Sequence, residues 1–497
     1  MQDDFNPRTL YQCVQLQVTT KFSVQWASKH KHSINKISVS QASKMPNNSK
    51  LQIAMFPWFA YGHMIPFLHL ANEFAKRGHT ISFLLPSNVI SKLANNRHSH
   101  LITFHALTLP PVPGLAPGAE TTADAKDSFV LSAAMDGTKD QVRAILEKDK
   151  PDFVFFDFAY WVPDLAREIG FKTVYFKVMS PTTSALKMVM SASIGRPLTA
   201  ADILTPPPGY PSSSNVTLRE HEARKAALFA NAHADELRKF FGRSAVGLRN
   251  CDLLAVRTVK ETEGIYCDYL ATQYKKPVLC IGAVLPEPRE DPLEDKISIW
   301  LTNFKPNSVV FCAFGSEWVL EKPQFQQLLL GLEQTNLPFL VALKPPKGTT
   351  SIEEALPEGF QERVQNRGMV YGGWVPQSLI LAHKSIGCFV NHCGYGSMWE
   401  SLMSDCQLVF VPNILDQSLN TRLMADELKV AVEVERDENG WFSKESICKA
   451  VKSVMDSDNQ IGCLVRENHS KWKKILTRPG FMSEYVDNFI QYLQGLV

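Results

Sequence analysis

The feature that most constrains the fold is a strand, a glycine-rich turn and a helix in the C-terminal half, followed by a second strand. Two apolar stretches, Ile386 to Val390 and Leu408 to Val411, have the length and composition of buried parallel strands. Between them, residues 391–397 have the sequence NHCGYGS, which predicts a tight turn into a helix that begins near Ser397. The free backbone amides at such a helix N-terminus bind anions, for example a diphosphate.

Ser397 and Glu400 also have a second interpretation. Their spacing fits a capping box, in which each side chain bonds a backbone amide at the helix terminus. In that case the two residues would only complete the end of the helix. The two interpretations are compatible with each other.

Residues 374–417 resemble the signature box of plant family 1 UDP-sugar-dependent glycosyltransferases, with matches at both ends and at most positions between. By this resemblance, Trp374 stacks on uracil, Gln377 contacts uridine and Glu400 holds the ribose hydroxyls. His392 and Ser397 would contact the diphosphate. The complete expected donor site consists of Ser316, Trp374, Val375, Gln377, His392, Gly394, Tyr395, Gly396, Ser397, Glu400, Asp416 and Gln417.

Two positions depart from the family pattern, because this chain has Tyr395 and Gly396 where most members have Trp-Asn. The missing amide side chain removes one expected phosphate contact. A glycine allows the backbone to approach the phosphate instead, so we expect an altered donor preference or affinity and not a loss of function. Asp416 and Gln417 match the family pair that hydrogen-bonds the sugar hydroxyls.

A second motif lies upstream, where Leu51 to Phe56 predicts a buried strand and residues 57–66 predict a turn before an amphipathic helix. His63 lies in this turn. The resemblance places the family's general base here, and a neutral imidazole can take a proton from a hydroxyl near neutral pH. Structural roles are expected for the histidines without such context, which are His69, His79 and His105.

The partner of His63 should be a carboxylate that orients the ring and stabilises the imidazolium. Asp157 follows the apolar segment Asp152 to Phe156, at the carboxyl end of a predicted strand, where ligand sites of open α/β sheets form. The family's dyad aspartate matches this position. The alternative role for Asp157 is an N-cap of the helix predicted from Trp161 to Ile169.

The resemblance implies an inverting displacement, in which His63 deprotonates the acceptor, the acceptor oxygen attacks the anomeric carbon and UDP leaves from the opposite face. Amides near residues 394–397 and nearby polar side chains would stabilise the leaving charge. The chain has no His/Cys grouping with the spacing of a structural zinc site, so we expect no metal and no cofactor. The UDP-sugar would be a co-substrate.

Two other classes of protein are alternatives to a glycosyltransferase. A nucleotide-dependent oxidoreductase needs a glycine-rich turn after its first strand, whereas residues 57–66 contain a single glycine. A catalytically weak or silent binding protein of the same fold should lack the base or its partner. His63 and Asp157 are both present, so Gly396 is the main support for this second alternative.

The composition is typical of a soluble globular protein. The 497 residues are 45% hydrophobic and 21% charged, with a formal net charge of +2. This charge gives no sign of a nucleic-acid partner, and no apolar stretch has the length of a membrane span. The ten cysteines show no disulfide pattern, which favours reduced thiols and a cytoplasmic location.

Alternating strands and helices predict an α/β protein, and the resemblance implies the GT-B fold, with two facing Rossmann-like domains and the active site in the cleft between them. Residues 1–44 lack apolar periodicity and are expected to form a disordered extension, with a transit peptide as the alternative. The other expected parts are an acceptor-binding domain at 45–284, a linker at 285–300, a donor-binding domain at 301–475 and a helix at 476–497 that crosses back to the first domain. The remaining expected strands are Thr80 to Leu85, Thr173 to Phe176, Leu253 to Val256, Ser308 to Phe311, Phe339 to Ala342 and Met369 to Tyr371.

The acceptor is expected to be a flavonoid-type glycoside. Residues 115–122, 157–161 and 391–401 resemble the subgroup that extends the sugar of a flavonoid or anthocyanidin 3-O-glucoside. Proline-rich loops at 109–118 and 206–211 would build the acceptor pocket. We expect a monomer that uses UDP-glucose, with UDP-xylose or UDP-rhamnose as alternative donors and a terpenoid glycoside as an alternative acceptor.

Overall fold

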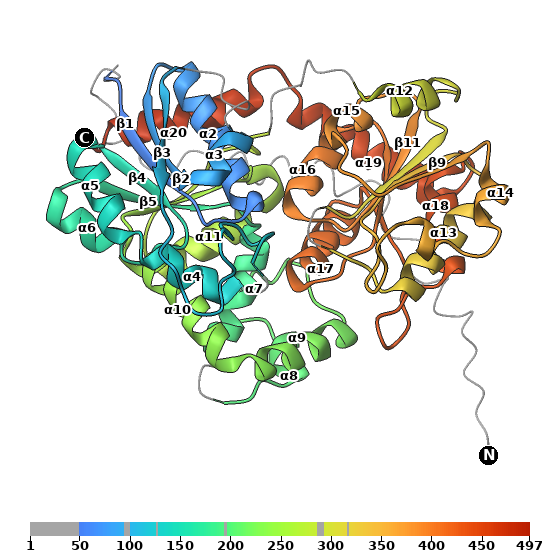
Figure 1. Cartoon of the computed structure of the whole chain (residues 1–497), viewed down its shortest axis with the longest axis horizontal. Helices are drawn as coiled ribbons and strands as arrows, with labels where there is room; N and C mark the ends of the chain where they lie inside the picture. The colour runs from blue at the N-terminus through green and yellow to red at the C-terminus, as the bar shows by residue number, and fades with distance from the viewer. Residues whose placement is uncertain (1–48, 94–99, 126–127, 193–195, 286–292, 316–317) are drawn as a thin grey trace. The chain divides into compact units, whose positions relative to one another are not determined.

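The computed structural model describes residues 49–497 except 94–99, 126–127, 193–195, 286–292 and 316–317 (Figure 1). The expected extension at 1–44, the proline-rich part of the expected linker and Ser316 therefore lie outside the described residues. Residues Lys50–Leu493 belong to one compact unit. This unit contains two parallel β-sheets, with helices between successive strands.

The first sheet has seven parallel strands in the order β3-β2-β1-β4-β5-β6-β7. Their bounds are β1 (Gln52–Phe56), β2 (Thr80–Pro86), β3 (Ile102–Leu107), β4 (Phe153–Phe156), β5 (Lys172–Lys177), β6 (Leu253–Val256) and β7 (Val278–Cys280). The sequence predicted all of these strands except β3 and β7. β3 is an edge strand with partly exposed residues on both faces, and β7 has only 3 residues, so neither carries a clear apolar pattern.

The second sheet has six parallel strands in the order β10-β9-β8-β11-β12-β13. Their bounds are β8 (Val309–Ala313), β9 (Phe339–Ala342), β10 (Gly368–Tyr371), β11 (Ile386–Asn391), β12 (Gln407–Phe410) and β13 (Val432–Glu433). All were predicted except the 2-residue strand β13. The α/β class expected from the sequence is therefore confirmed.

Each sheet is buried on both faces, which explains the continuous apolar strands. In β8, Val309 and Phe311 belong to one hydrophobic core, whereas Val310 and Cys312 belong to another. In β1, the side chain of Met55 likewise lies in a different core from that of Phe56. Successive side chains of a strand point to opposite faces, so parallel strands covered by helices on both sides have no polar face.

Helices lie between the strands and after the last one. Their bounds are α2 (Tyr61–Lys76), α3 (Ser87–Leu93), α4 (Ser128–Asp136), α5 (Lys139–Asp149), α6 (Val162–Ile169), α7 (Pro181–Ala192), α8 (Ala200–Leu204), α9 (Glu220–Ala232), α10 (Ala234–Asn250), α11 (Lys260–Tyr274), α12 (Asp295–Thr302), α13 (Lys322–Gln334), α14 (Phe360–Val364), α15 (Gln377–Leu381), α16 (Tyr395–Met403), α17 (Leu415–Arg422), α18 (Lys444–Met455), α19 (Gln460–Leu476) and α20 (Phe481–Gln494), with a short 3-10 helix at Glu353–Ala355 and a π-helical turn at Leu423–Glu427. Helix α12 begins inside the expected linker.

Helix α2 begins earlier than the sequence predicted. Residues 57–66 were expected to form a turn, but the helix starts at Tyr61 and contains Pro66. A proline there removes one backbone hydrogen bond to the preceding turn. The apolar side chains of Met64 and Phe67, which are fully buried, offset this loss.

The last helix, α20, packs against the first sheet. Phe489 and Ile490 share a hydrophobic core with Ile53 of β1. Arg77, at the end of α2, donates to the Asp487 carboxylate at 2.5 Å. Figure 1 shows α20, near the C-terminus, beside α2 and β1, the first two elements of the described chain.

Both sheets reverse their strand order next to their first strand. β1 lies between β2 and β4, and β8 lies between β9 and β11. Neighbouring connections leave such a point in opposite directions, and ligands of open α/β sheets bind at the carboxyl ends of the strands there. His63 and Asp157 follow the two strands at one reversal, and Gly315 and His392 follow the two strands at the other.

A substitution in β11 tests the packing of the second sheet. A Cβ on Gly387 would lie 2.2 Å from the backbone carbonyl oxygen of Asn307, at a register shift between β8 and β11. Because a backbone atom cannot move away at low cost, Gly387→Ala is expected to lower the free energy of unfolding by about 1–3 kcal/mol. The measurement is the urea midpoint. Gly242→Ala, at a helical site where a Cβ meets nothing within 4 Å, is the control and should not lose stability.

Candidate active site

His63 and Asp157 lie in direct contact. The Nδ1 atom of His63 lies 2.5 Å from Oδ2 of Asp157, and the backbone amide of Trp58 donates to Oδ1 at 2.7 Å. The carboxylate is thus shared between the segment after β1 and the histidine of α2. The N-cap of α6 is Trp161, so the alternative role of Asp157 as an N-cap of that helix is wrong.

This contact fixes the chemistry that the imidazole can perform. A carboxylate next to Nδ1 places the ring proton on that nitrogen, which leaves the lone pair on Nε2 available as a base. The side chain of His63 is 25% exposed, whereas that of Asp157 is 4% exposed. Solvent or an acceptor can therefore reach the histidine but not its partner.

Aromatic side chains hold the segment that supplies the Trp58 amide. The Trp58 and Phe158 rings lie 4.8 Å apart between centroids, and those of Phe158 and Phe240 lie 4.2 Å apart. Such ring contacts stabilise this segment in addition to the burial of apolar area.

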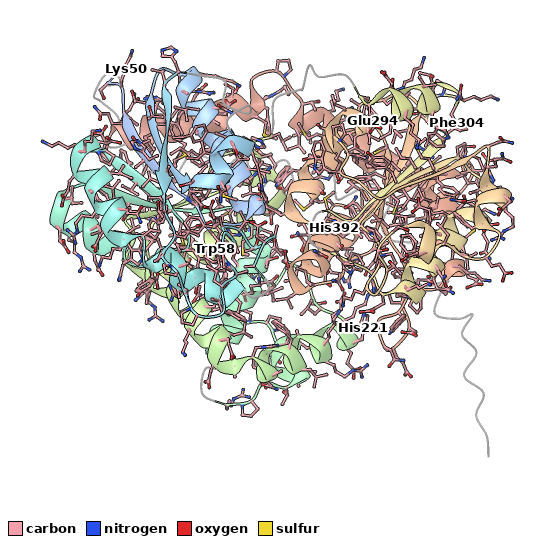
Figure 2. The ribbon with its side chains drawn as sticks, viewed as in Figure 1. Lys50, Trp58, His221, Glu294, Phe304 and His392 are labelled. Atoms are coloured by element: carbon pink, nitrogen blue, oxygen red, sulfur yellow. The ribbon has the colours of Figure 1, made fainter. Side chains whose placement is uncertain are left out.

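Figure 2 labels Trp58 on the half of the chain with the first sheet and His392 on the half with the second.

The turn after β11 has a different construction from the expected one. The residue with a left-handed backbone is Cys393, at φ 56°, and not a glycine. The Asn391 side-chain oxygen accepts from the Cys393 amide at 2.8 Å, and the Asn420 side-chain amide donates to the Cys393 carbonyl at 3.0 Å. These bonds stabilise a conformation that is otherwise costly for a side chain with a Cβ.

Gly394 is required by close approach. A Cβ there would lie 2.6 Å from Nε2 of His392. Gly394 is also the N-cap of α16, so this helix begins at Tyr395, two residues before the predicted start at Ser397. The first-turn amides therefore belong to residues around Tyr395 and Gly396.

The expected uridine, ribose and phosphate positions meet at one place. The Gln377 side-chain amide donates to Oε2 of Glu400 at 2.8 Å and to Oγ of Ser397 at 3.3 Å. No side chain caps α16, so the capping-box interpretation of Ser397 and Glu400 is wrong. Burial raises the pKa of Glu400, and the bond from Gln377 opposes this rise. The three side chains can bind a polar ligand together.

His392 joins the ends of β8 and β11. Its Cε1 atom lies 2.9 Å from the place where a Cβ on Gly315 would stand. Its Nδ1 atom is buried and has no hydrogen-bond partner among the described residues. Burial lowers the pKa of His392 to about 4, although Asp416 acts in the opposite direction. The ring is therefore neutral at pH 7.

The remaining expected donor residues differ in their environment. Trp374 is 71% exposed, whereas Val375 is 8% exposed and its side chain belongs to the core. The side-chain oxygen of Gln417 accepts from the backbone amides of Asn413 at 3.0 Å and Ile414 at 3.4 Å. Its carbonyl thus caps α17, which leaves its amide group to bond a ligand.

Sequence reasoning missed a buried polar cluster next to Tyr395. The Glu263 side chain is fully buried, and its carboxylate accepts hydrogen bonds from Ser180, Thr182, Thr258 and Tyr395. The Tyr395 hydroxyl also lies 2.7 Å from the carbonyl oxygen of Arg257. The available signal was a pair of charged residues, Arg257 and Glu263, soon after the predicted strand β6.

The described residues offer neither a metal site nor a membrane span. No group of three or more His, Cys, Asp or Glu side chains in the described ranges is placed to hold a metal ion. The chain has one Asp-x-Asp spacing, at Asp456 to Asp458, and it forms the turn between α18 and α19, where the Asp458 amide donates to the Asp456 side chain at 2.9 Å. No helix among the described residues is long and apolar enough to span a membrane.

Comparisons with known proteins agree with this arrangement. Residues 286–488 match the family model described as UDP-glucoronosyl and UDP-glucosyl transferase. UDP-glycosyltransferase 79B9 of Arabidopsis thaliana is 52% identical over 89% of this chain and 97% of its own length. An Arabidopsis thaliana protein named anthocyanidin 3-O-glucoside 2'''-O-xylosyltransferase is 50% identical over 90% of this chain and 98% of its own.

Solved structures show the same fold at low sequence identity. A UDP-glucosyltransferase from Polygonum tinctorium has a TM-score of 0.72 at 19% identity, over 90% of this chain and 99% of its own. Os79 from O. sativa, in complex with UDP, has a TM-score of 0.71 at 20% identity, over 89% of this chain and 100% of its own.

The fold is therefore that of the GT-B glycosyltransferases, with two Rossmann-like domains. The chain belongs to the plant family 1 UDP-sugar-dependent glycosyltransferases. It is a UDP-glycosyltransferase.

Removing the negative charge of Asp157 tests the dyad. Asp157→Asn keeps the size of the side chain but permits the wrong histidine tautomer, so kcat is expected to fall by about 100-fold or more while UDP affinity stays within twofold. Steady-state kinetics and calorimetric UDP titration measure the two quantities. Asp164→Asn on α6 is the control, since its carboxylate pairs only locally with Arg167. A kcat within threefold of the parent would show that Asp157 does not orient His63.

The lowered pKa of His392 predicts a pH dependence of stability. Its ordinary value is 6.5, and its value in the folded chain is about 4. As pH falls through this interval, the unfolded chain binds a proton at this residue before the folded chain does, so stability is lost. Ligand-free His392→Asn should therefore lose less stability than the parent between pH 7 and pH 4.5, measured by urea midpoints. His100→Asn, at an exposed histidine, should follow the parent.

Proposed function

We propose that this enzyme transfers a sugar from a UDP-sugar, with inversion and without a metal ion, to a hydroxyl on the sugar of a flavonoid or anthocyanidin 3-O-glucoside. The observation that carries the proposal is the contact between His63 and Asp157 at the strand-order reversal of the first sheet. It provides a base whose side chain is 25% exposed and whose partner is buried.

The reaction follows from this geometry. Nε2 of His63 takes the proton of the acceptor hydroxyl, and the acceptor oxygen forms a bond to the anomeric carbon. The bond from that carbon to the diphosphate oxygen breaks, and UDP leaves with the electron pair from the opposite face. Asp157 stabilises the imidazolium that forms.

The first turn of α16 would stabilise the leaving group. UDP gains negative charge as it leaves, and the free amides of this helix end and the hydroxyl of Ser397 meet that charge without rearrangement. Neutral His392 adds a hydrogen bond and not a full charge, because its pKa is about 4. Trp374, Gln377 and Glu400 would hold the uridine.

The acceptor class is supported by two observations. A relative of 50% identity carries the name anthocyanidin 3-O-glucoside 2'''-O-xylosyltransferase. Residues 109–118 and 206–211 contain no helix or strand. Loops of this kind suit an aromatic aglycone. We further propose UDP-glucose as the donor and a monomer in the cytoplasm.

The test is product formation with a panel of flavonoid 3-O-glucosides and separate reactions with UDP-glucose, UDP-xylose and UDP-rhamnose. Mass spectrometry should show a gain of one sugar with one of the donors, and NMR of the product should show an inverted anomeric centre. His63→Ala should reduce product formation by at least about 100-fold, the upper part of what general-base catalysis contributes.

Two further arms sharpen this experiment. The rate should stay within twofold in excess EDTA, because the proposed charge stabilisation comes from protein groups alone. UDP binding without turnover of any panel member would contradict the proposed acceptor class or favour a silent binding protein. Turnover that survives in His63→Ala would remove the proposed base.

A further inference from the structure

We propose that the Arg257 side chain is a donor-positioning residue, whose guanidinium binds the diphosphate of the UDP-sugar in place of the side chain that Gly396 lacks. This inference rests on the proposed function and adds a residue to its donor site. It is carried by the burial of Arg257, by its unpaired nitrogens and by the space above Gly396.

Arg257 follows β6 directly and is only 3% exposed. Its Nε atom donates to the carbonyl oxygen of Ala283 at 2.5 Å, which fixes the direction of the side chain. Its two terminal nitrogens make no hydrogen bond or ion pair with any residue that the structure describes. The residue as a whole is thus buried, while its two terminal nitrogens are unused donors that keep some exposure.

An unpaired guanidinium in this environment is costly. Burying a cation without a partner costs several kcal/mol, and arginine does not escape this cost by losing its proton at neutral pH. Burial lowers the pKa of Arg257, and the nearby side chains of Tyr395 and Glu400 oppose this only in part. The arrangement is therefore suited to an anion that arrives with a ligand.

The guanidinium points to the first turn of α16. Its Nη1 atom lies 4.0 Å from the position that a Cβ on Gly396 would take, and among the described residues no other atom outside α16 itself lies within that distance. The backbone of Gly396 is not left-handed, so neither conformation nor crowding requires a glycine there. The space is open to a side chain, and Arg257 borders it.

A second buried group points to a ligand at the same turn. Nδ1 of His392 is also buried without a partner among the described residues. A diphosphate at the first turn of α16 would meet free helix amides and a forked cation, which binds phosphate oxygens in a bidentate manner. The missing amide side chain at residue 396 would then be replaced by a cation from another strand.

Arg257 also has a purely structural interpretation, as a link between the two halves of the chain. The bond that makes this link is accepted by its backbone carbonyl, from the Tyr395 hydroxyl at 2.7 Å. A side-chain substitution leaves that carbonyl in place. The two interpretations therefore predict different results.

The experiment compares the affinities of Arg257→Gln and the parent for UDP and for uridine by calorimetry. Arg257→Gln should weaken UDP binding by at least tenfold and change uridine binding by less than twofold, because uridine has no phosphate. Arg257→Lys should fall between the two for UDP, since a lysine keeps the charge but not the fork. Arg249→Gln, at an exposed arginine in the last turn of α10, removes the same charge and should match the parent.

A rescue variant separates phosphate binding from general damage. Gly396→Asn in the Arg257→Gln background should regain several-fold in UDP affinity, because an amide side chain then occupies the open space. Equal losses for UDP and uridine, or unchanged UDP binding, would overturn the role of Arg257. If Arg257→Gln fails to fold, Arg257→Lys and the single variant Gly396→Asn carry the test.

The outcome is distinct from that of the proposed function. A parent that glycosylates a panel acceptor while Arg257→Gln binds UDP normally refutes only the role of Arg257. A parent that does not bind UDP refutes both. If the parent shows no turnover but Arg257→Gln still loses tenfold in UDP affinity and keeps its uridine affinity, the role of Arg257 is supported and the proposed acceptor is wrong.

Discussion

The site depends most on the hydrogen bonds that the fully buried carboxylate of Glu263 accepts. A charge without exposure is tolerated only when its oxygens are hydrogen-bonded, and here Ser180, Thr182, Thr258 and Tyr395 supply the donors. Bonds to a charged group contribute about 1.5–3 kcal/mol each when the alternative is an unsatisfied ion. Because one donor is the first residue of α16, the carboxylate fixes the helix end that is proposed to receive the diphosphate.

The same principle separates the roles of the two buried carboxylates. Glu263 has all its bonds inside the protein and no access to a substrate. Asp157 is also buried, but one of its two partners is a histidine with 25% exposure. Asp157 can therefore influence a group at the surface only through the His63 ring. Full satisfaction makes a carboxylate structural, whereas a titratable and accessible partner makes it useful for proton transfer.

The sequence was sufficient for most of the fold, because buried parallel strands have a distinct apolar pattern. It was insufficient where an element is short or at an edge, as for β3, β7 and β13. His63 was predicted from the family resemblance, and Asp157 from the resemblance and from its place after a predicted strand; the structure places the two side chains in contact. The predicted start of α16, near Ser397, was wrong because the left-handed residue of the turn is Cys393. Asn391 and Asn420 stabilise this conformation through contacts that a local sequence pattern does not encode.

Gly396 illustrates why a motif position has to be judged in three dimensions. By sequence alone its missing side chain is a loss, since one phosphate contact disappears. In the structure the vacated space borders a guanidinium that comes from a segment 139 positions earlier in the chain, beside a helix end that already attracts anions. Under the proposed role of Arg257, a ligand contact would move from a neutral amide to a cation, which would raise the electrostatic share of binding.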